Sequence, residues 1–521
     1  MSPSRPNGVV NFFVVNAYRV VSEFVVISGK LFREHWSTFS LTFTVLRTAF
    51  IKILGNQYTG ISSVFTTILT MLSLSELGFG TAIATALYKP LKDRDTIKIQ
   101  QLMYFYKKAY YFVAGFILII GLALTPFLKY LIKDVPDIKE DIRLIYSMYI
   151  IKTSVSYLMI YKTTLLNADQ KIYIVKKLEM ICQAIRYIIE VVALIIFREF
   201  LLYLIIEIAA TIVQNLIITK KAEKEYPYAF QRPENTLSKP SMLSLMKDVK
   251  GLSLFKLSGT IGNSIDTILI SGFINTSTVA IVGNYTLIKD HLYKLLMQFF
   301  TSVIPSIGNL AAEGSGEKQE IVFNRLFYIS FLVVNFCSTS MFVLFRPFIS
   351  LWLGSDYLLS TQISFVISFD FFLYILLEAV ASFRTANGLF VKGQYRPLVT
   401  ALLNVVLSVL LIKRYGIFGT IFATIIARLT TQWYDPFLLY KYIFKKSFGK
   451  FYVRYLCYIV IYLCGMMLSG YLYMKFTGFN MLSDLLIGIM ICLIVPNAIS
   501  VILTFKSDEF NYFKKMLFKR V

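Results

Sequence analysis

The strongest constraint on this chain is a succession of long apolar runs that carry few charged residues. A helix needs about 20 apolar residues to cross ~30 Å of hydrocarbon at about 1.5 Å per residue. About fourteen runs approach or exceed this length, near residues 36–54, 61–88, 109–132, 142–166, 172–197, 200–219, 252–274, 278–308, 321–346, 360–383, 394–415, 417–440, 451–474 and 481–505. The runs are continuous and do not alternate every second residue, which predicts membrane-spanning helices and not a β-barrel.

Composition supports an all-α integral membrane protein. Only 16% of the 521 residues are charged and the mean hydropathy is +0.64, whereas about a quarter of the residues of a soluble domain are charged. The five cysteines all lie inside apolar runs, and the two histidines are far apart in the sequence. We therefore expect no disulfide, no metal site and no cofactor.

The net charge of +23 raises the question of nucleic-acid binding. If both termini are cytoplasmic, about 37 of the 53 lysines and arginines fall in cytoplasmic loops and tails, about 10 in outside loops and about 6 in the membrane. This asymmetry orients a membrane protein and attracts anionic lipid. The sequence thus predicts a multi-pass membrane protein with both termini in the cytoplasm, and no nucleic-acid partner.

The polar segments divide the chain into predicted domains. Residues 9–28 are apolar but contain Asn16, Arg19 and Glu23, which favours an interfacial amphipathic helix over a span. The longest polar interval, 220–250, separates six predicted spans from eight. The predicted organisation is an N-terminal segment 1–35, an N-lobe 36–219, a cytoplasmic linker 220–250, a C-lobe 251–446, a two-helix hairpin 447–507 and a basic cytoplasmic tail 508–521.

Two stretches resemble a known family. The first is "LRTAFIKILGNQYTGISSVFTTILTMLSLSELGFGTAIATALYKPLKDRDTIKI", Leu46 to Ile99, with an arginine in the first helix, an "LG..Y.G" turn, a "SLSELGFG" segment and an "LYKPL" exit. The second is "LSGTIGNSIDTILISGF", Leu257 to Phe273. Both resemble the Wzx-like polysaccharide flippases of the multidrug/oligosaccharidyl-lipid/polysaccharide (MOP) superfamily, to which the MATE transporters also belong.

The resemblance implies a fold and a function. It implies two pseudo-symmetric six-helix bundles that form an inverted V around a central cavity, plus a C-terminal two-helix hairpin. The resemblance implies that the protein lies in the bacterial plasma (inner) membrane. By alternating access such a protein moves an undecaprenyl-pyrophosphate-linked oligosaccharide across that membrane for capsule, exopolysaccharide or O-antigen biosynthesis. The partners it implies are this lipid-linked oligosaccharide, membrane lipids and assembly proteins such as a polysaccharide polymerase.

Ionisable residues inside the predicted spans are the candidates for function. A charge at the bilayer centre costs from ~2.5 to more than ~10 kcal/mol, so it is retained where it serves a purpose. These residues are Arg47, Glu76, Lys152, Arg186, Glu190, Glu207, Asp266, Lys289, Asp290, His291, Lys294, Asp370, Glu378 and Arg428.

A cationic wall is predicted from four of them, Arg47, Lys289, His291 and Lys294. A pyrophosphate carries about two negative charges, and lysine and arginine supply the compensating charge and donors. Asp290 and Lys294 are four residues apart and can pair along one helix face. Arg47 also occupies the position of the family's cavity arginine.

The remaining charges divide into two groups. Possible ion coupling, to H⁺ or Na⁺, or ion pairs in the cavity are predicted for Glu76, Asp266, Asp290, Asp370 and Glu378. For Asp266 a cationic partner such as Arg47 or Lys289 is expected. Structural roles are favoured for Lys152, Arg186 and Arg428, and Glu190, four residues after Arg186, is expected to be its intrahelical partner.

Other functions remain open at this point. A peptidoglycan lipid-precursor flippase would share the predicted electrostatics, whereas a multidrug or cation antiporter of the same superfamily should need anionic cavity residues. A membrane polysaccharide polymerase or glycosyltransferase should need a sizeable extramembrane catalytic loop, and the longest loop, 220–250, has no such motif. A non-catalytic scaffold would leave the buried charges unexplained. We therefore expect a transporter and not an enzyme.

Overall fold

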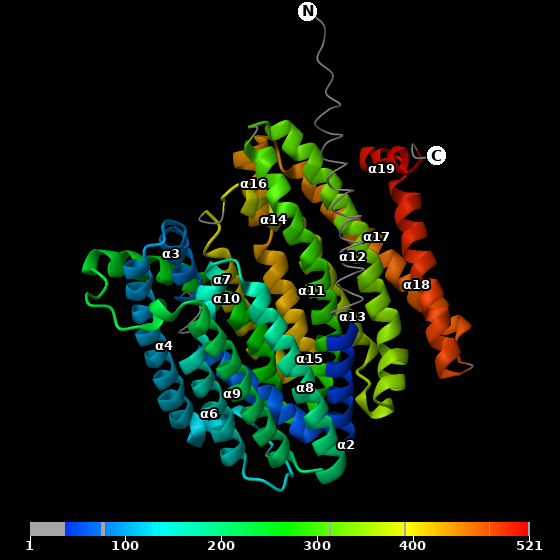
Figure 1. Cartoon of the computed structure of the whole chain (residues 1–521). Helices are drawn as coiled ribbons and strands as arrows, with labels where there is room; N and C mark the ends of the chain where they lie inside the picture. The colour runs from blue at the N-terminus through cyan, green and yellow to red at the C-terminus, as the bar shows by residue number, and fades with distance from the viewer. Residues whose placement is uncertain are drawn as a thin grey trace, which may run out of the picture. The chain divides into compact units, whose positions relative to one another are not determined.

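The computed structural model describes residues 37–73, 79–134, 136–312, 314–389, 392–478 and 480–518. Throughout these ranges the ordered elements are helices, and none of the described residues lies in a strand (Figure 1). The predicted N-terminal amphipathic segment lies outside the described residues. The described residues form two compact units, one within 35–280 and the other within 281–521.

The first unit contains the helices up to the start of α11. They are α2 Ser37–Leu72, α3 Phe79–Asp93, α4 Thr96–Leu124, α5 Leu128–Leu131, α6 Ile142–Ile160, α7 Thr163–Ala168, α8 Ile172–Phe197, α9 Phe200–Glu225 and α10 Lys239–Phe273. α4 packs on α6, α8 packs on α9, and α2 packs on α8 and α10. A buried aromatic and aliphatic core that includes Tyr106, Tyr161 and Leu165 joins α3, α4 and α7.

The second unit contains most of α11 and all helices that follow. They are α11 Thr276–Ala312, α12 Gly316–Trp352, α13 Thr361–Leu376, α14 Glu378–Ala386, α15 Arg396–Thr431, α16 Tyr434–Leu439, α17 Gly449–Phe476, α18 Met481–Thr504 and α19 Asp508–Phe518. Its core is centred on α12, where Phe323, Phe327 and Phe331 are fully buried.

The helices confirm the prediction of an all-α multi-pass membrane protein. Among the described residues, nine helical stretches are long and apolar enough to cross a membrane. The other predicted spans lie on α2, α3, α6, α7 and α10, and the two spans predicted near 394–415 and 417–440 form one stretch with α15 and α16. Many large apolar side chains on α8, α17 and α18 are exposed, as expected for surfaces solvated by lipid.

α15 is a helical hairpin and not a straight helix. Its backbone leaves the helical conformation at Gly416, where φ is 56° and ψ is −136°, a region that glycine enters without steric penalty. The two arms then run antiparallel, because Thr400 Oγ1 lies 2.7 Å from Thr431 Oγ1 and Thr424 donates to Asn404 Oδ1 at 3.2 Å. The sequence therefore placed the break between these two spans correctly.

The C-terminal hairpin of α17 and α18 is an integral part of the second unit. α18 packs along α12 (Figure 1), and fully buried Asn335 on α12 donates to the Pro496 carbonyl at 3.2 Å and to Ser500 Oγ at 2.8 Å. Tyr328 and Thr504 hydroxyls lie 2.8 Å apart. Polar contacts of this kind join helices where the hydrophobic effect cannot, since lipid tails are as apolar as the side chains.

The polar interval between the lobes is largely structured. Its first part continues α9 to Glu225 and is followed by a short 3₁₀ turn at Pro227–Phe230. Its last part already belongs to α10, which begins at Lys239 and continues without interruption into the seventh predicted span. α10 packs on α2, α3 and α5 of the first unit. The lobe boundaries predicted from the sequence stay a prediction.

Gly60, the last glycine of the "LG..Y.G" motif, marks a close helix contact. A Cβ atom at this position would lie 2.0 Å from the carbonyl oxygen of Thr276, at the start of α11. Only a residue without a side chain allows this approach. The motif glycine therefore has a packing role within the first unit.

Replacing Gly60 with alanine is expected to destabilise the protein by about 1–3 kcal/mol, because the backbone at Thr276 must move away. The matched control is Gly115→Ala in α4, where an added Cβ meets nothing within 4 Å and alanine favours the helix by up to ~1 kcal/mol. Thermal unfolding of the purified variants in detergent compares the two. Equal unfolding temperatures for Gly60→Ala and wild type would contradict the packing role.

Candidate functional site

Three helices of the second unit bring together three of the ionisable residues identified in the sequence. Asp370 on α13 is 5% exposed, and its Oδ1 lies 3.2 Å from Arg428 Nε on α15. Its Oδ2 lies 3.7 Å from Lys289 Nζ on α11. Two cations thus share one buried carboxylate, and one positive charge is left over. We call these three residues the Asp370 cluster.

Two tyrosines extend this cluster. The Arg428 guanidinium carbon lies 4.2 Å from the centroid of the Tyr374 ring, a cation–π geometry. Tyr374 stacks on Tyr293 of α11 with ring centroids 5.4 Å apart, and their hydroxyls are 3.3 Å apart. Neither tyrosine is predictable from the sequence, because nothing there distinguishes them from the other 32 of the chain's 34 tyrosines. Only the tertiary structure places these two tyrosines next to Arg428.

The neighbouring turn of α11 carries the other predicted charges. Asp290 and Lys294 are exposed, and no ion pair between these two residues occurs in the described part of the chain. Asp290 nevertheless lies close enough to Lys289, Lys294 and His291 for electrostatic interaction. His291 is half-buried, and its Nδ1 lies 2.8 Å from the carbonyl oxygen of Leu287, one turn earlier. The ion-pair partner of Lys289 is thus not a residue of α11 but Asp370 on α13.

A second buried charge cluster ties α14, α15 and α16 together. Asp435 is 7% exposed and forms an ion pair with Arg384, while Arg396 Nη2 lies 3.1 Å from its Oδ2. Glu378, a predicted coupling residue at the start of α14, interacts electrostatically with Arg428, Arg396 and Arg384. We call Arg384, Asp435 and Arg396 the Asp435 cluster, and Glu378 connects it with the Asp370 cluster. The Asp435 cluster was not predicted from the sequence, because its members lie at or near the ends of the predicted spans.

The first unit has a charge cluster of its own. Lys152 Nζ on α6 lies 2.7 Å from Glu207 Oε1 on α9, and Arg186 Nη1 on α8 lies 4.0 Å from the same oxygen. Arg186 Nε is 3.5 Å from Glu190, which is fully buried. The predicted intrahelical pair of Arg186 and Glu190 is confirmed, and the structural roles favoured for Lys152 and Arg186 agree with their ion pairs across helices.

Two further predicted site residues, Arg47 and Asp266, lie on helices of the first unit. Arg47 on α2 is half-buried and lies close enough to Tyr203 of α9 for electrostatic interaction. Asp266 is half-buried on α10. Glu76 falls in the range 74–78, outside the described residues. The roles of all three stay predictions.

The second unit brings several cations close together. The Asp370 cluster retains a positive charge, and exposed Lys294 lies just over one helical turn from Lys289 on α11. Lysine and arginine side chains suit phosphate groups because each supplies several donors and a full charge. No group of three or more histidine, cysteine, aspartate or glutamate side chains suited to a metal ion occurs among the described residues.

Comparison of the structure with solved structures identifies the fold. A multidrug resistance MATE family transporter of the MOP superfamily superposes with a TM-score of 0.60 and 12% identity, over 77% of this chain and 95% of that chain. The lipid II flippase MurJ superposes with a TM-score of 0.63 and 16% identity, over 90% of this chain and 98% of that chain.

A third similar structure is the Vibrio cholerae MATE transporter VcmN, with a TM-score of 0.51 and 14% identity over 78% of this chain and 95% of that chain. By sequence alone, no protein-family model and no curated protein matches the chain. The chain therefore has the helical fold of these transporters and of the flippase.

Proposed function

We propose that this protein is a flippase that moves a polyprenyl-pyrophosphate-linked oligosaccharide across the bacterial plasma membrane by alternating access, with both termini in the cytoplasm. The observation that carries the proposal is the surplus positive charge of the Asp370 cluster, with exposed Lys294 nearby on the same helix. A diphosphate entering a low-dielectric environment requires such compensation. The oligosaccharide serves capsule, exopolysaccharide or O-antigen assembly.

The proposed pyrophosphate ligands are cationic side chains, most of them on α11. Lys294 contacts the pyrophosphate directly, because its side chain is exposed. Lys289 adds a second cation, since Asp370 retains Arg428 when Lys289 turns toward the substrate. Arg47 and His291 are further contacts proposed from the sequence. Proton or sodium coupling through Asp266 or Glu378 belongs to the same proposal.

A second candidate function is the flipping of a peptidoglycan lipid precursor. The observation in its favour is the superposition with the lipid II flippase MurJ over 90% of this chain, compared with 77% for the MATE family transporter. A multidrug or cation antiporter is less well supported, because a cationic drug would be repelled by the surplus positive charge near Lys289.

The proposed function predicts flipping of a fluorescent polyprenyl-pyrophosphate oligosaccharide in proteoliposomes that contain the purified full-length protein. Labelled lipid in the outer leaflet is bleached by an impermeant reductant, so flipping raises the bleached fraction above that of protein-free liposomes. A lipid II analogue and a fluorescent cationic drug are tested in parallel, each with an imposed proton or sodium gradient. Flipping of the lipid II analogue alone would transfer the assignment to the second candidate, and transport of the drug alone would overturn the flippase proposal.

A further inference from the structure

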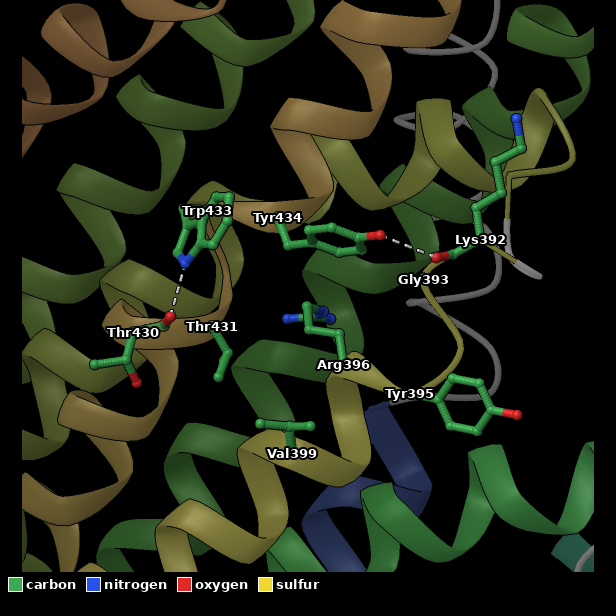
Figure 2. A pocket seen from close by; sticks show the side chains of 9 residues that line it. All are labelled: Lys392, Gly393, Tyr395, Arg396, Val399, Thr430, Thr431, Trp433 and Tyr434. Carbon is green, nitrogen blue, oxygen red and sulfur yellow. Dashed lines mark hydrogen bonds between the residues drawn. The ribbon is translucent and has the colours of Figure 1, made fainter.

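A pocket of about 320 Å³ opens at the end of the α15 hairpin opposite to Gly416 (Figure 2). One wall comes from the loop before α15 and from the first turn of that helix, the other from the end of its second arm and the start of α16. The lining residues are Lys392, Gly393, Tyr395, Arg396, Val399, Thr430, Thr431, Trp433 and Tyr434. All of them belong to the second unit, so the pocket is complete within it.

Two of the lining residues, Lys392 and Arg396, are charged, and both are cations. Arg396 carries the central charge. Figure 2 places its guanidinium between the two walls. Its Nη2 lies 3.1 Å from Asp435 Oδ2. Asp435 is shared with Arg384, so it cannot neutralise both arginines. Lys392 adds a cation at the rim, where its Nζ lies 3.3 Å from the centroid of the Tyr442 ring.

The wider electrostatic environment is also positive. The Asp435 and Asp370 clusters and Glu378 interact with one another. Together they contain the four cations Lys289, Arg384, Arg396 and Arg428 and the three carboxylates Asp370, Glu378 and Asp435. Asp290 and Lys294 on the neighbouring turn of α11 add one charge of each sign, so one positive charge is left over even when every carboxylate is ionised. The pocket therefore favours an anion.

Aromatic side chains indicate the depth of the pocket in the membrane. Trp433 is 47% exposed and donates its indole N–H to the Thr430 carbonyl at 2.8 Å, and the Tyr434 hydroxyl donates to the Lys392 carbonyl at 3.4 Å. Tyr395 is 63% exposed. Tryptophan and tyrosine concentrate at the level of the lipid headgroups, where one end of the ring is apolar and the other is hydrated.

An exposed apolar stripe leads away from the pocket along the first arm of α15. Val399 lines the pocket, and Leu402, Val406 and Leu410 follow at spacings of three and four residues, on one helix face. Each of the four is more than half exposed. A pocket of this volume holds a headgroup but not a whole lipid, and the stripe offers an apolar surface for a hydrocarbon tail.

We propose that this pocket binds the phosphate-bearing headgroup of an anionic membrane lipid, with Arg396 as the phosphate ligand and the lipid tail along Val399, Leu402, Val406 and Leu410. Basic pockets between membrane helices bind anionic headgroups in this way. Two sources share the chemistry, a phospholipid of the bilayer and a polyprenyl pyrophosphate. The lipid site does not depend on the proposed transport function.

The test uses Trp433 as a reporter in the purified full-length protein. The other two tryptophans are replaced in the background Trp36→Phe/Trp352→Phe, and quenching of Trp433 by brominated phosphatidylglycerol is compared with quenching by brominated phosphatidylcholine in mixed micelles. We expect the anionic lipid to quench at about tenfold lower mole fraction, the effect of one charge-assisted contact. Equal quenching by both lipids would overturn the proposal.

Three variants test whether the preference for the anionic lipid arises in this pocket. Arg396→Ala should abolish the preference for the anionic lipid, and Arg414→Ala, near the Gly416 end of the same hairpin, is the matched control that should retain it. Because Arg396→Ala also removes an ion pair with Asp435, Thr430→Phe provides a second variant that fills the pocket and leaves the pair intact. An unchanged preference in Thr430→Phe would show that the lipid binds elsewhere and would overturn the proposal.

Competition experiments then distinguish the two candidate lipids, a bilayer phospholipid and a polyprenyl pyrophosphate. Displacement of brominated phosphatidylglycerol by polyprenyl pyrophosphate at lower mole fraction than by unlabelled phosphatidylglycerol would identify the pyrophosphate lipid as the occupant, and the reverse order would identify a bilayer phospholipid. Displacement by inorganic pyrophosphate alone, at concentrations similar to those of the lipids, would overturn the role assigned to the apolar stripe. A Thr430→Phe protein that loses lipid preference but still flips substrate would separate this site from the transport site.

Discussion

Replacing Asp435 with alanine is expected to lower the free energy of unfolding by about 3–5 kcal/mol, the usual cost when one partner of a buried ion pair is removed. Asp435 is the shared partner of Arg384, whose side chain is 8% exposed, and of Arg396. Without the carboxylate, two guanidinium groups remain in a poorly solvated environment among α14, α15 and α16. Thermal and denaturant unfolding of the purified protein in detergent measures the loss.

Two controls accompany this variant. Asp435→Asn retains the shape and hydrogen-bond acceptor but not the charge, so its loss should be intermediate. Lys446→Ala removes an ion pair with Glu320 in which the lysine is 50% exposed, and such a pair contributes no more than about 1 kcal/mol. If Asp435→Ala and Lys446→Ala are equally stable, the Asp435 cluster does not hold the three helices together.

Replacing Lys294 with alanine is expected to slow substrate flipping by about tenfold or more, because one charge-assisted contact to a pyrophosphate contributes about 1.5 kcal/mol or more. The fold should be retained, since Lys294 is exposed. Lys289→Ala should slow flipping to a similar degree and also remain folded, because Asp370 keeps its contact with Arg428 at 3.2 Å. Flipping of the fluorescent polyprenyl-pyrophosphate oligosaccharide in proteoliposomes measures both rates.

The matched control is Lys475→Ala, which removes an exposed lysine near the end of α17. It should flip at the wild-type rate. Wild-type rates in Lys289→Ala and Lys294→Ala, with wild-type flipping intact, would remove the Asp370 cluster and Lys294 from the mechanism while leaving the flippase function in place. Loss of folding in either variant would show that the lysine stabilises the helices, and would contradict the expectation that the fold is retained.

Helix positions were predictable because the bilayer imposes a local rule. Every backbone polar group must be paired within the segment, so a run of about 20 apolar residues has few alternatives to a helix. The break between the arms of α15 was equally predictable, since Gly416 interrupts the apolar pattern between two runs. The pair of Arg186 and Glu190 was predictable because residues four apart on a helix are neighbours.

The ion pairs between helices were not predictable in the same way. Spacing along α11 suggested that Asp290 would pair with Lys294, but Lys289 pairs with Asp370 of α13, which also binds Arg428 of α15. Such a pairing depends on how the helices are rotated and how far they slide along one another. Side-chain packing among several helices decides both, and no single segment contains that information.

The sequence by itself thus determined the class of protein, the approximate helix positions and the set of charges that require an explanation, because hydropathy and helical spacing act within one segment. Only the tertiary structure decided which of those charges share a carboxylate, that the C-terminal hairpin packs on α12 through Asn335, and that Arg396, Trp433 and Tyr434 enclose a pocket. These features arise where separate helices meet, and burial at such contacts selects among many pairings that the sequence leaves equally open.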